Sequence, residues 1–187
     1  GNVPLDLCVK NALIAVDVAG TYAPPVYRGM ARPLVRPKLF TADYVHGKDG
    51  LSDLNLPYPP LSEAKGHAMD AIIDTVMQNP GEIEIVTLGP LTNLAMAYLK
   101  EPRIAENVKK VYIMGATGMD QGNATPAAEF NVYVDAEAAK IVLDSGMDVG
   151  RLPGRHGDHS RRHRIPARPA QPRRGFLCRL HRRPARL

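Results

Sequence analysis

Three polar side chains, Asn123, Glu129 and Asn131, lie close together in the stretch GNATPAAEFNVYVD, residues 122–135. An amide both donates and accepts hydrogen bonds, whereas an ionised carboxylate only accepts them. Neutral hydroxyl groups are recognised by directed hydrogen bonds of both kinds, so this combination suits a polyol better than a metal or a phosphate. Because Glu129 and Asn131 are two residues apart, we expect their side chains to share one face of an extended segment. The spacing alone leaves open an ordinary loop of cap and turn residues.

The elements that must position these side chains alternate between helix and strand. We expect helices over residues 5–19, closed by Gly20, over 61–79 with Ser62 as N-cap, over 89–102, and from Asp135 to Gly146. Strands are expected near residues 25–29, over 82–88 and 109–115, and from 147. This order predicts an α/β fold with a mostly parallel sheet flanked by helices. Ligands collect at the carboxyl ends of such strands, which Leu88 and Met114 mark.

The charge divides the chain into two unlike parts. Residues 150–187 hold 12 Arg, no Lys and one acid, a net charge of +11, whereas residues 1–149 have a net charge of −6. The first part predicts a domain over 1–149. The second is a tail rich in Arg and Pro without periodicity, which we expect to be disordered or the product of a reading-frame error. A basic arm that binds nucleic acid is the alternative, and the absence of interleaved aromatic residues other than Phe176 argues against it.

Composition excludes several other classes. The sequence has no run of about 18 apolar residues and no signal-peptide pattern, so we expect no membrane association and a cytoplasmic location. The two cysteines, Cys8 and Cys178, lie far apart without the spacing of a metal or redox site. A disulfide framework is therefore not expected.

Several longer motifs carry a family resemblance. VHGKDGLSD, VTLGPLTNLAMA, VYIMGATG and GNATPAAEFNVYVDAEAAKIVLDSG occur in this order, after the opening GNVPLDLCVKNAL. Over residues 1 to about 149 the chain resembles the inosine-uridine preferring nucleoside hydrolase family. The resemblance implies hydrolysis of the N-glycosidic bond of purine or pyrimidine ribonucleosides to ribose and free base, with Ca²⁺ as cofactor. For the complete family protein it leaves a homo-oligomer open.

The resemblance also implies roles for particular residues. Asn2 would bind a ribose hydroxyl, Met114 would lie under the sugar, and the main-chain carbonyl of Leu88 would be a ligand of Ca²⁺. Asn123, Glu129 and Asn131 would hold the ribose, chiefly through its 5′- and 3′-hydroxyls. His46 would approach the leaving base, where an imidazole can give up a proton.

Other interpretations of these and neighbouring residues stay open. His46 also fits a solvated turn, and Met114 fits a core position. Thr92 and Asn93 are interpreted as turn and cap residues, and Asp144 as a residue on a solvated face. No role is assigned to the remaining loop carboxylates, which are Asp43, Asp49 and Asp53.

Two family features are missing from this sequence. The family's first strand carries a D-x-D-x-G-x-D-D segment, and a late His-Asp pair closes its site; neither occurs in this chain, and GDHS at 157–160 does not match the pair. A lone carbonyl does not hold Ca²⁺. We therefore expect a chain truncated at both ends, inactive or nearly so, and poorly stable without its sheet neighbours. The alternatives are a non-catalytic fragment that binds ribose weakly and a nucleic-acid-binding module.

Overall fold

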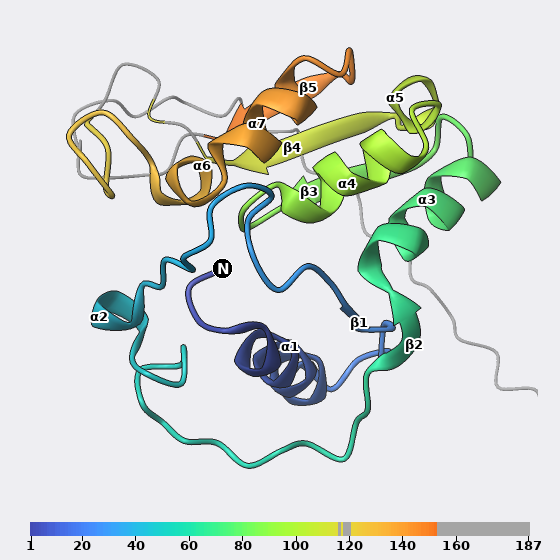
Figure 1. The fold of residues 1–187 in the computed structure, drawn as a ribbon. Coiled ribbons are helices and arrows are strands. Elements are labelled where there is room, and N and C mark those ends of the chain that lie inside the picture. The colour runs from blue at the N-terminus through green and yellow to red at the C-terminus, as the bar shows by residue number, and fades with distance from the viewer. Residues whose placement is uncertain (116, 118–120, 153–187) are drawn as a thin grey trace, which may run out of the picture. The chain divides into compact units, whose positions relative to one another are not determined.

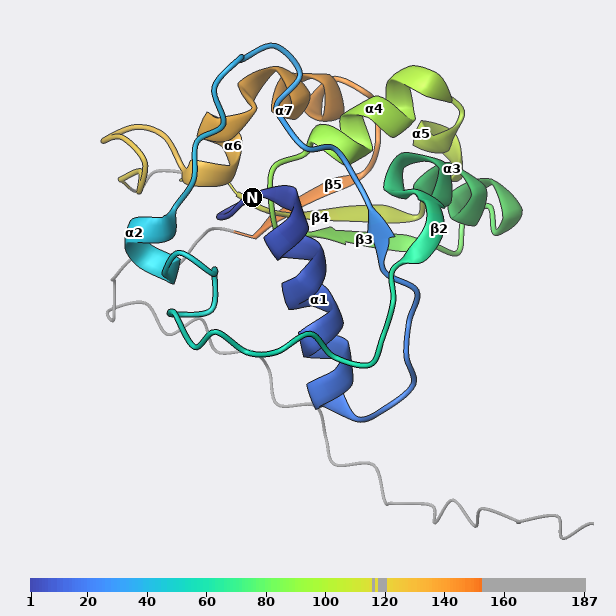
Figure 2. The same ribbon diagram turned by 60° about the horizontal axis from the view of Figure 1, so that its bottom comes forward.

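The computed structural model describes residues 1–115, 117 and 121–152 as two parallel sheets with helices around them (Figures 1 and 2). β1 (Tyr27–Arg28) pairs with β2 (Ala64–His67), and a second sheet has the order β3 (Glu84–Thr87), β4 (Lys110–Met114), β5 (Val149–Leu152). The helices are α1 (Leu5–Ala19), α2 (Asp43–His46), α3 (Ala68–Gln78), α4 (Thr92–Lys100), α5 (Ile104–Asn107), α6 (Phe130–Val134) and α7 (Ala136–Leu143). The paired strands are all parallel, which confirms the predicted α/β class.

The three-stranded sheet forms because its strands alternate between core and non-core residues. Val111 and Ile113 of β4 are buried, while Lys110, Tyr112 and Met114, which alternate with them, are only half-buried. Thr87 of β3 pairs with Ile113, so Leu88 and Met114 come to the same edge of the sheet, at the carboxyl ends of neighbouring strands. This arrangement, which the sequence predicted, brings the turn before α4 next to the chain that follows β4.

The hydrophobic core lies on one face of this sheet, under α3, α4 and α7 (Figure 2). Alanines at 95, 97, 138 and 139 allow α4 and α7 to approach closely, and all four are almost fully buried. β3 is at the edge of the described sheet, and its neighbourhood is open, since Val86 is 57% and Leu88 71% exposed. Strands of a parallel sheet are normally covered on both faces, so β3 is incompletely packed within the described residues.

Two helices match their predicted boundaries closely. α1 spans 5–19 and ends at Gly20, which adopts a left-handed backbone with φ of 60°. A residue without Cβ adopts that conformation at no steric cost, which is why the helix stops there. α7 begins after Asp135, whose carboxylate accepts the backbone N–H of Ala138 and so caps the helix as predicted.

The prediction of a helix over 61–79 with Ser62 as its N-cap is wrong at its start. Residues 64–67 form β2 beside β1, and α3 begins only at Ala68. Gly66 has a φ of 103°, outside the helical region, and His67 is extended. The Nδ1 atom of His67 accepts the N–H of Met69 at 3.1 Å, so an imidazole caps this helix where a hydroxyl was expected.

The extended segment expected around Glu129 and Asn131 is also wrong. Residues 130–134 form the short helix α6, and Glu129 is its N-cap, with φ of −78° and ψ of 146°. The Glu129 carboxylate accepts the N–H of Val132 at 3.1 Å. An oxygen at this position satisfies an otherwise unpaired helix N–H, which favours the helix over a strand.

The expected tail lies almost entirely outside the described residues. β5 reaches Leu152, which pairs with Met114, so the strand expected from 147 continues past residue 149. The boundary between domain and tail stays a prediction, and Cys178 and the GDHS segment lie outside the described residues. Within the described ranges, no helix combines the length and hydropathy needed to cross a lipid bilayer.

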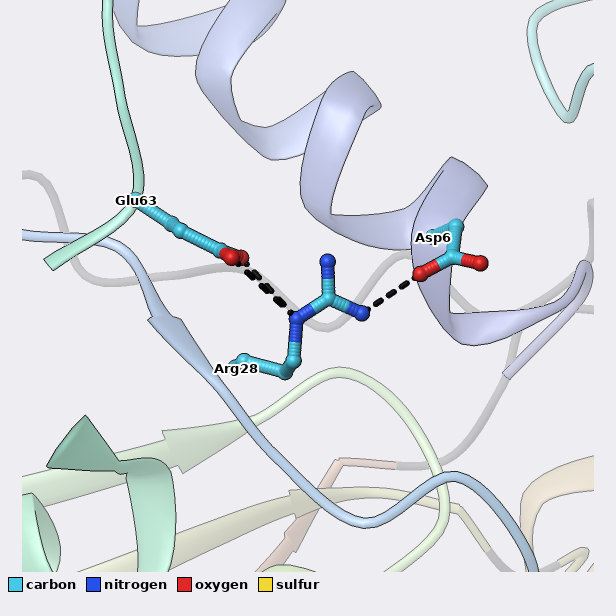
Figure 3. A network of polar contacts seen from close by, with 3 residues as sticks. All are labelled: Asp6, Arg28 and Glu63. Carbon is cyan, nitrogen blue, oxygen red and sulfur yellow. Dashed lines mark hydrogen bonds and ion pairs between the residues drawn. The ribbon is translucent and has the colours of Figure 1, made fainter. Parts of the chain in front are cut away.

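Arg28 joins α1 to the two-stranded sheet (Figure 3). Its Nη1 donates to the Asp6 carboxylate on α1 at 2.5 Å, and its Nε donates to Glu63, just before β2, at 3.1 Å. The Asp6 carboxylate, followed by that of Glu63, raises the pKa of Arg28 above its ordinary value. The network is exposed, so its contribution to stability is small and screened by salt.

We expect Arg28→Ala to lower the thermal midpoint by about 1–3 °C in 50 mM NaCl, and by less in 1 M NaCl. The reason is that the Ala variant loses two exposed ion pairs, whose attraction salt screens. Thermal unfolding followed by circular dichroism measures the change. Arg32→Ala is the matched control, because the described residues offer Arg32 no ion pair. Equal shifts for both variants, or a shift of Arg28→Ala that ignores salt, would contradict the assignment.

Candidate functional site

Polar groups gather around the carboxyl end of β4. The Nδ2 of Asn131 donates to the main-chain oxygen of Met114 at 3.0 Å and lies 3.5 Å from its Sδ. Glu129 lies beside Gly115, the residue after Met114. A Cβ placed on Gly115 would be 3.2 Å from Oε2 of Glu129. Glu129 is 6% and Asn131 7% exposed, so both side chains are held in a nearly closed setting.

Asn123 joins the preceding loop to the start of α6. Its Oδ1 accepts the N–H of Phe130, the first residue of α6, at 2.6 Å. The loop itself closes on short backbone bonds, from Gly122 N–H to the Pro126 carbonyl and from Ala124 N–H to the Ala128 carbonyl, both 3.0 Å. The structure therefore brings together four of the predicted substrate-binding residues, which we call the β4 cluster: Met114, Asn123, Glu129 and Asn131.

Each polar member of the β4 cluster uses one group to hold the scaffold. The second group, which is Nδ2 of Asn123, Oε1 of Glu129 or Oδ1 of Asn131, has no hydrogen bond to another described residue. Within the described residues, one donor amide and two acceptor oxygens thus stay without a partner. A hydroxyl both donates and accepts, so this remainder suits neighbouring hydroxyls on one small molecule.

Asn2 and His46 lie in a second group of segments. The Asn2 carbonyl accepts the N–H of Ala42 at 2.8 Å, immediately before α2, and α2 ends at His46. The His46 carbonyl accepts the N–H of Ser52 at 2.7 Å, and the side chain is half-buried. Among the described residues, no hydrogen bond joins Asn2 or His46 to the β4 cluster. Their contacts with sugar and base stay predictions.

Asp49 organises the loop after His46, a role that the sequence alone did not reveal. Its carboxylate accepts the backbone N–H groups of Leu51, Asp53 and Asn55 at 2.7–2.8 Å. Its carbonyl accepts Nδ2 of Asn11, which ties the loop to α1 at 2.8 Å. Such side-chain bonds stabilise left-handed residues, and Ser52, Asp53 and Asn55 all have positive φ. The signal in the sequence was the run DGLSDLN, which is dense in turn-forming residues.

Acid is expected to open this loop through Asp49. The N–H groups of Leu51 and then Asn55 hold the pKa of Asp49 below its ordinary value, so the folded loop favours the charged carboxylate. A depressed pKa gives stability that is present above the ordinary value and is lost as the pH falls below it. Amide hydrogen exchange at 51, 53 and 55 should therefore speed up from pH 5 towards pH 3, beyond the intrinsic trend.

The Asp49→Asn variant keeps one acceptor oxygen, so it is expected to lose the bond to the Asn55 N–H and to hold the loop less tightly at every pH in this range, with no further response to acid. Asp43→Asn is the control, because Asp43 accepts from the Thr41 hydroxyl and makes no bond to this loop's N–H groups. Protection at these three amides that is unchanged in Asp49→Asn would refute the role of Asp49.

A cavity of about 450 Å³ lies between the N-terminal segment and the turn from β3 into α4. Leu88, Gly1 and Val3 are among the residues that line it, and Asn2 lies between the latter two in the chain. No side chain of the β4 cluster lines this cavity. Leu88 thus borders this cavity, whereas the β4 cluster lies at the end of the neighbouring strand and does not line it.

The described residues do not by themselves fit a calcium site. Ca²⁺ takes six to eight oxygen ligands, of which several are usually carboxylates. No group of three or more Asp, Glu, His or Cys residues with the spacing of a metal site occurs in the described part of the chain. The Leu88 carbonyl remains a candidate for one ligand, and a carbonyl alone is too weak to hold the ion.

Thr92 and Asn93 serve neither as caps nor as turn residues. The N-cap of α4 is Leu91, without a side-chain bond. The Thr92 hydroxyl donates to the buried carboxylate of Asp135 at 2.6 Å, and Oδ1 of Asn93 accepts the N–H of Met30 at 2.8 Å. Both residues fix distant segments to the turn that carries Leu88. Sequence spacing offered no sign of these long-range bonds.

Comparison with known proteins agrees with this arrangement. The sequence profile described as "Inosine-uridine preferring nucleoside hydrolase" matches residues 1–159. The chain is 43% identical to "Probable uridine nucleosidase 1" of Oryza sativa subsp. japonica, covering 80% of this chain and 46% of that protein. It is 44% identical to the "Inosine-uridine preferring nucleoside hydrolase" of Leishmania major, covering 80% of this chain and 48% of that protein.

The fold comparison gives the same result. The structure of a "Purine-Preferring Ribonucleoside Hydrolase from Gardnerella vaginalis" superposes with a TM-score of 0.77 at 31% identity. That match covers 81% of this chain and 49% of the other. The chain thus spans about half the length of the relatives that it matches.

Proposed function

Because this chain belongs to the inosine-uridine preferring nucleoside hydrolase family, we propose that it carries the ribose-binding part of an enzyme that hydrolyses the N-glycosidic bond of ribonucleosides. Ribose and a free base are the products of that reaction. The observation that carries the proposal is the β4 cluster: Glu129 and Asn131 lie at the end of β4, Asn123 bonds the start of α6, and each of the three keeps a group unbonded by the described residues.

The chemistry of the reaction explains what such a cluster contributes. Glycosidic cleavage passes through an oxocarbenium-like state in which the sugar ring flattens. Hydrogen bonds to the ribose hydroxyls accelerate the reaction when they fit the flattened ring better than the relaxed one. The Asn123 amide would donate, and the oxygens of Glu129 and Asn131 would accept, at the 5′- and 3′-hydroxyls. Their attachment to the end of β4 and to α6 would hold them in a fixed geometry.

The leaving base is the second part of the proposal. Relatives with names that specify uridine, inosine-uridine or purine ribonucleosides all resemble this chain, so the substrate class is a ribonucleoside and the base stays open. His46 would contact the base from the loop that Asp49 holds, and Asn2 would contact the sugar. Ca²⁺ belongs to the proposal for the whole enzyme, with Leu88 as one ligand, and the contacts of the β4 cluster with ribose do not depend on it.

Ribose binding and base release test the proposal separately. Three or four hydrogen bonds, each with a net contribution of about 1 kcal/mol, give a dissociation constant on the order of millimolar. We expect D-ribose to shift the NMR signals of residues 123, 129 and 131 in the 187-residue chain at such concentrations. Release of hypoxanthine from inosine, or of uracil from uridine, is expected to stay below detection with or without Ca²⁺.

Asn123→Asp is the most informative variant. An aspartate keeps an oxygen for the Phe130 N–H but has no amide to donate to the sugar, so ribose should bind roughly fivefold more weakly while the loop stays closed. Base release that disappears in this variant would mean that the chain is itself catalytic. Ribose binding without release supports the non-catalytic fragment, and the absence of both contradicts the proposal.

Nucleic-acid binding through the basic tail is the competing function. It predicts salt-dependent DNA binding that is lost on deleting residues 150–187, and we expect no such binding. The cytoplasmic location and the homo-oligomer of the complete family protein also stay predictions.

A further inference from the structure

Asp135 is the one fully buried carboxylate in the described part of the chain, with 0% of its surface exposed. No described cation pairs with it. Burying an ionised group without a counter-charge is costly unless hydrogen bonds replace its water. Three donors do so in this structure. Oδ2 accepts the Thr92 hydroxyl at 2.6 Å and the Leu34 N–H at 3.1 Å, and Oδ1 accepts the Ala138 N–H at 3.1 Å.

The three donors come from three segments that surround the candidate site. Thr92 begins α4, four residues after Leu88, and Ala138 belongs to α7. Leu34 lies in the loop that also contacts α6 through a ring contact of Phe40 with Tyr133, whose centroids are 5.4 Å apart. Asp135 itself directly follows α6, the helix that begins after Glu129 and carries Asn131.

Position 135 requires a carboxylate. All three partners are donors, and they approach both oxygens. An asparagine would offer one oxygen and would place its NH₂ group against a remaining donor, so at least one bond would be lost. The arrangement therefore depends on two acceptor oxygens, a geometric requirement beyond the ordinary capping of α7.

We propose that Asp135 is a positioning residue, which fixes the end of α6 against the first turn of α4 and so sets the separation between the β4 cluster and the Leu88 carbonyl. The β4 cluster and the Leu88 carbonyl lie at the ends of β4 and β3, whose register is fixed by their pairing. Only the chain that follows each strand is therefore free to change the separation between them. The Asp135–Thr92 bond removes that freedom. The inference about positioning rests on the proposed function for its biological meaning, but the bond and its effect on Asn131 do not.

The matched pair Thr92→Val and Thr92→Ser tests this inference in the 187-residue chain. Valine keeps the branched shape and loses the hydroxyl, whereas serine keeps the hydroxyl. The readout is the NMR signal of the Asn131 side-chain NH₂, which reports the bond to the Met114 carbonyl. We expect this signal to move in Thr92→Val and to stay near its original position in Thr92→Ser. Ribose binding should weaken roughly fivefold in the valine variant alone.

The outcomes separate positioning from general stability. A Thr92→Val protein that is less stable in urea but keeps the original Asn131 signal would overturn the inference, because the bond would then be merely structural. If Thr92→Val does not fold, Thr92→Ala gives the same test, since it removes the hydroxyl that bonds Asp135 and leaves no methyl group against the carboxylate, and it should also move the signal. If the unmodified chain does not bind ribose, the proposed function fails, and the Asn131 signal still decides the positioning.

Discussion

Alanine at Gly122 is expected to disrupt the loop that presents Asn123 and to abolish detectable ribose binding. A Cβ at this position would overlap the Thr125 carbonyl oxygen and the backbone nitrogen and oxygen of Ala128, well inside the 3.0 Å limit that real Cβ contacts respect. These are backbone atoms of a tight turn, which cannot rotate away as the end of a long side chain can. The loop must open, and Asn123 then loses its bond to the N–H of Phe130.

The effect should be larger on binding than on stability. Because a surface loop relaxes, we expect a loss of about 1–3 kcal/mol in the free energy of unfolding, measured in urea. The ribose-dependent NMR shifts should vanish. Gly89→Ala is the control, since nothing lies within 4 Å of a Cβ there and its φ is not in the left-handed region. A Gly122→Ala protein that binds ribose normally would show that this loop does not hold Asn123 for the sugar.

Truncation of Ile104 to alanine is expected to cost about 2–5 kcal/mol of unfolding free energy. Ile104 is 0% exposed and belongs to the core cluster formed by α3, α4 and β4, which it enters from the four-residue helix α5. Such a short helix is stable only through its buried side chain. The substitution therefore removes packing and also the anchor of α5, which precedes β4.

Two milder substitutions give reference values for the cost of Ile104→Ala. Ile104→Val removes one methylene and should cost about 0.5–1.5 kcal/mol. Leu99→Ala, at a side chain on α4 that is 54% exposed, should change stability by less than about 0.5 kcal/mol. Urea unfolding of the three variants should rank them in this order. An Ile104→Ala cost no larger than that of Leu99→Ala would mean that α5 does not anchor the core.

The elements that the sequence predicted well are those with strong local signals. α1 has a helical apolar stripe and a terminal glycine, and α7 follows an aspartate cap and ends before Gly146. The two errors came from caps of unusual type. An imidazole at His67 and a long carboxylate at Glu129 start helices where serine or aspartate is the ordinary signal, so α3 was placed too early and α6 was taken for an extended segment.

For the candidate site, too, the sequence could identify some residues and not others. Asn123, Glu129 and Asn131 could be singled out because they lie within nine residues of each other and share one type of chemistry. The supports could not be found, because they join residues far apart in sequence. Asp135 bonds Thr92 across 43 positions and Leu34 across 101, and no local pattern records such a pair. Asp49 was passed over for a different reason, since a loop carboxylate looks the same whether it faces solvent or backbone.

The pairing of Thr87 with Ile113 restricts how this sequence can change in length. Side chains alternate between the two faces of a strand, so one inserted residue in β3 would turn Leu88, and one in β4 would turn Met114, to the opposite face. Deletions would have the same effect. Relatives should therefore gain or lose residues between α4 and β4, or in the turns at the amino ends of the strands, and keep the spacing from each strand to the loop that follows it constant.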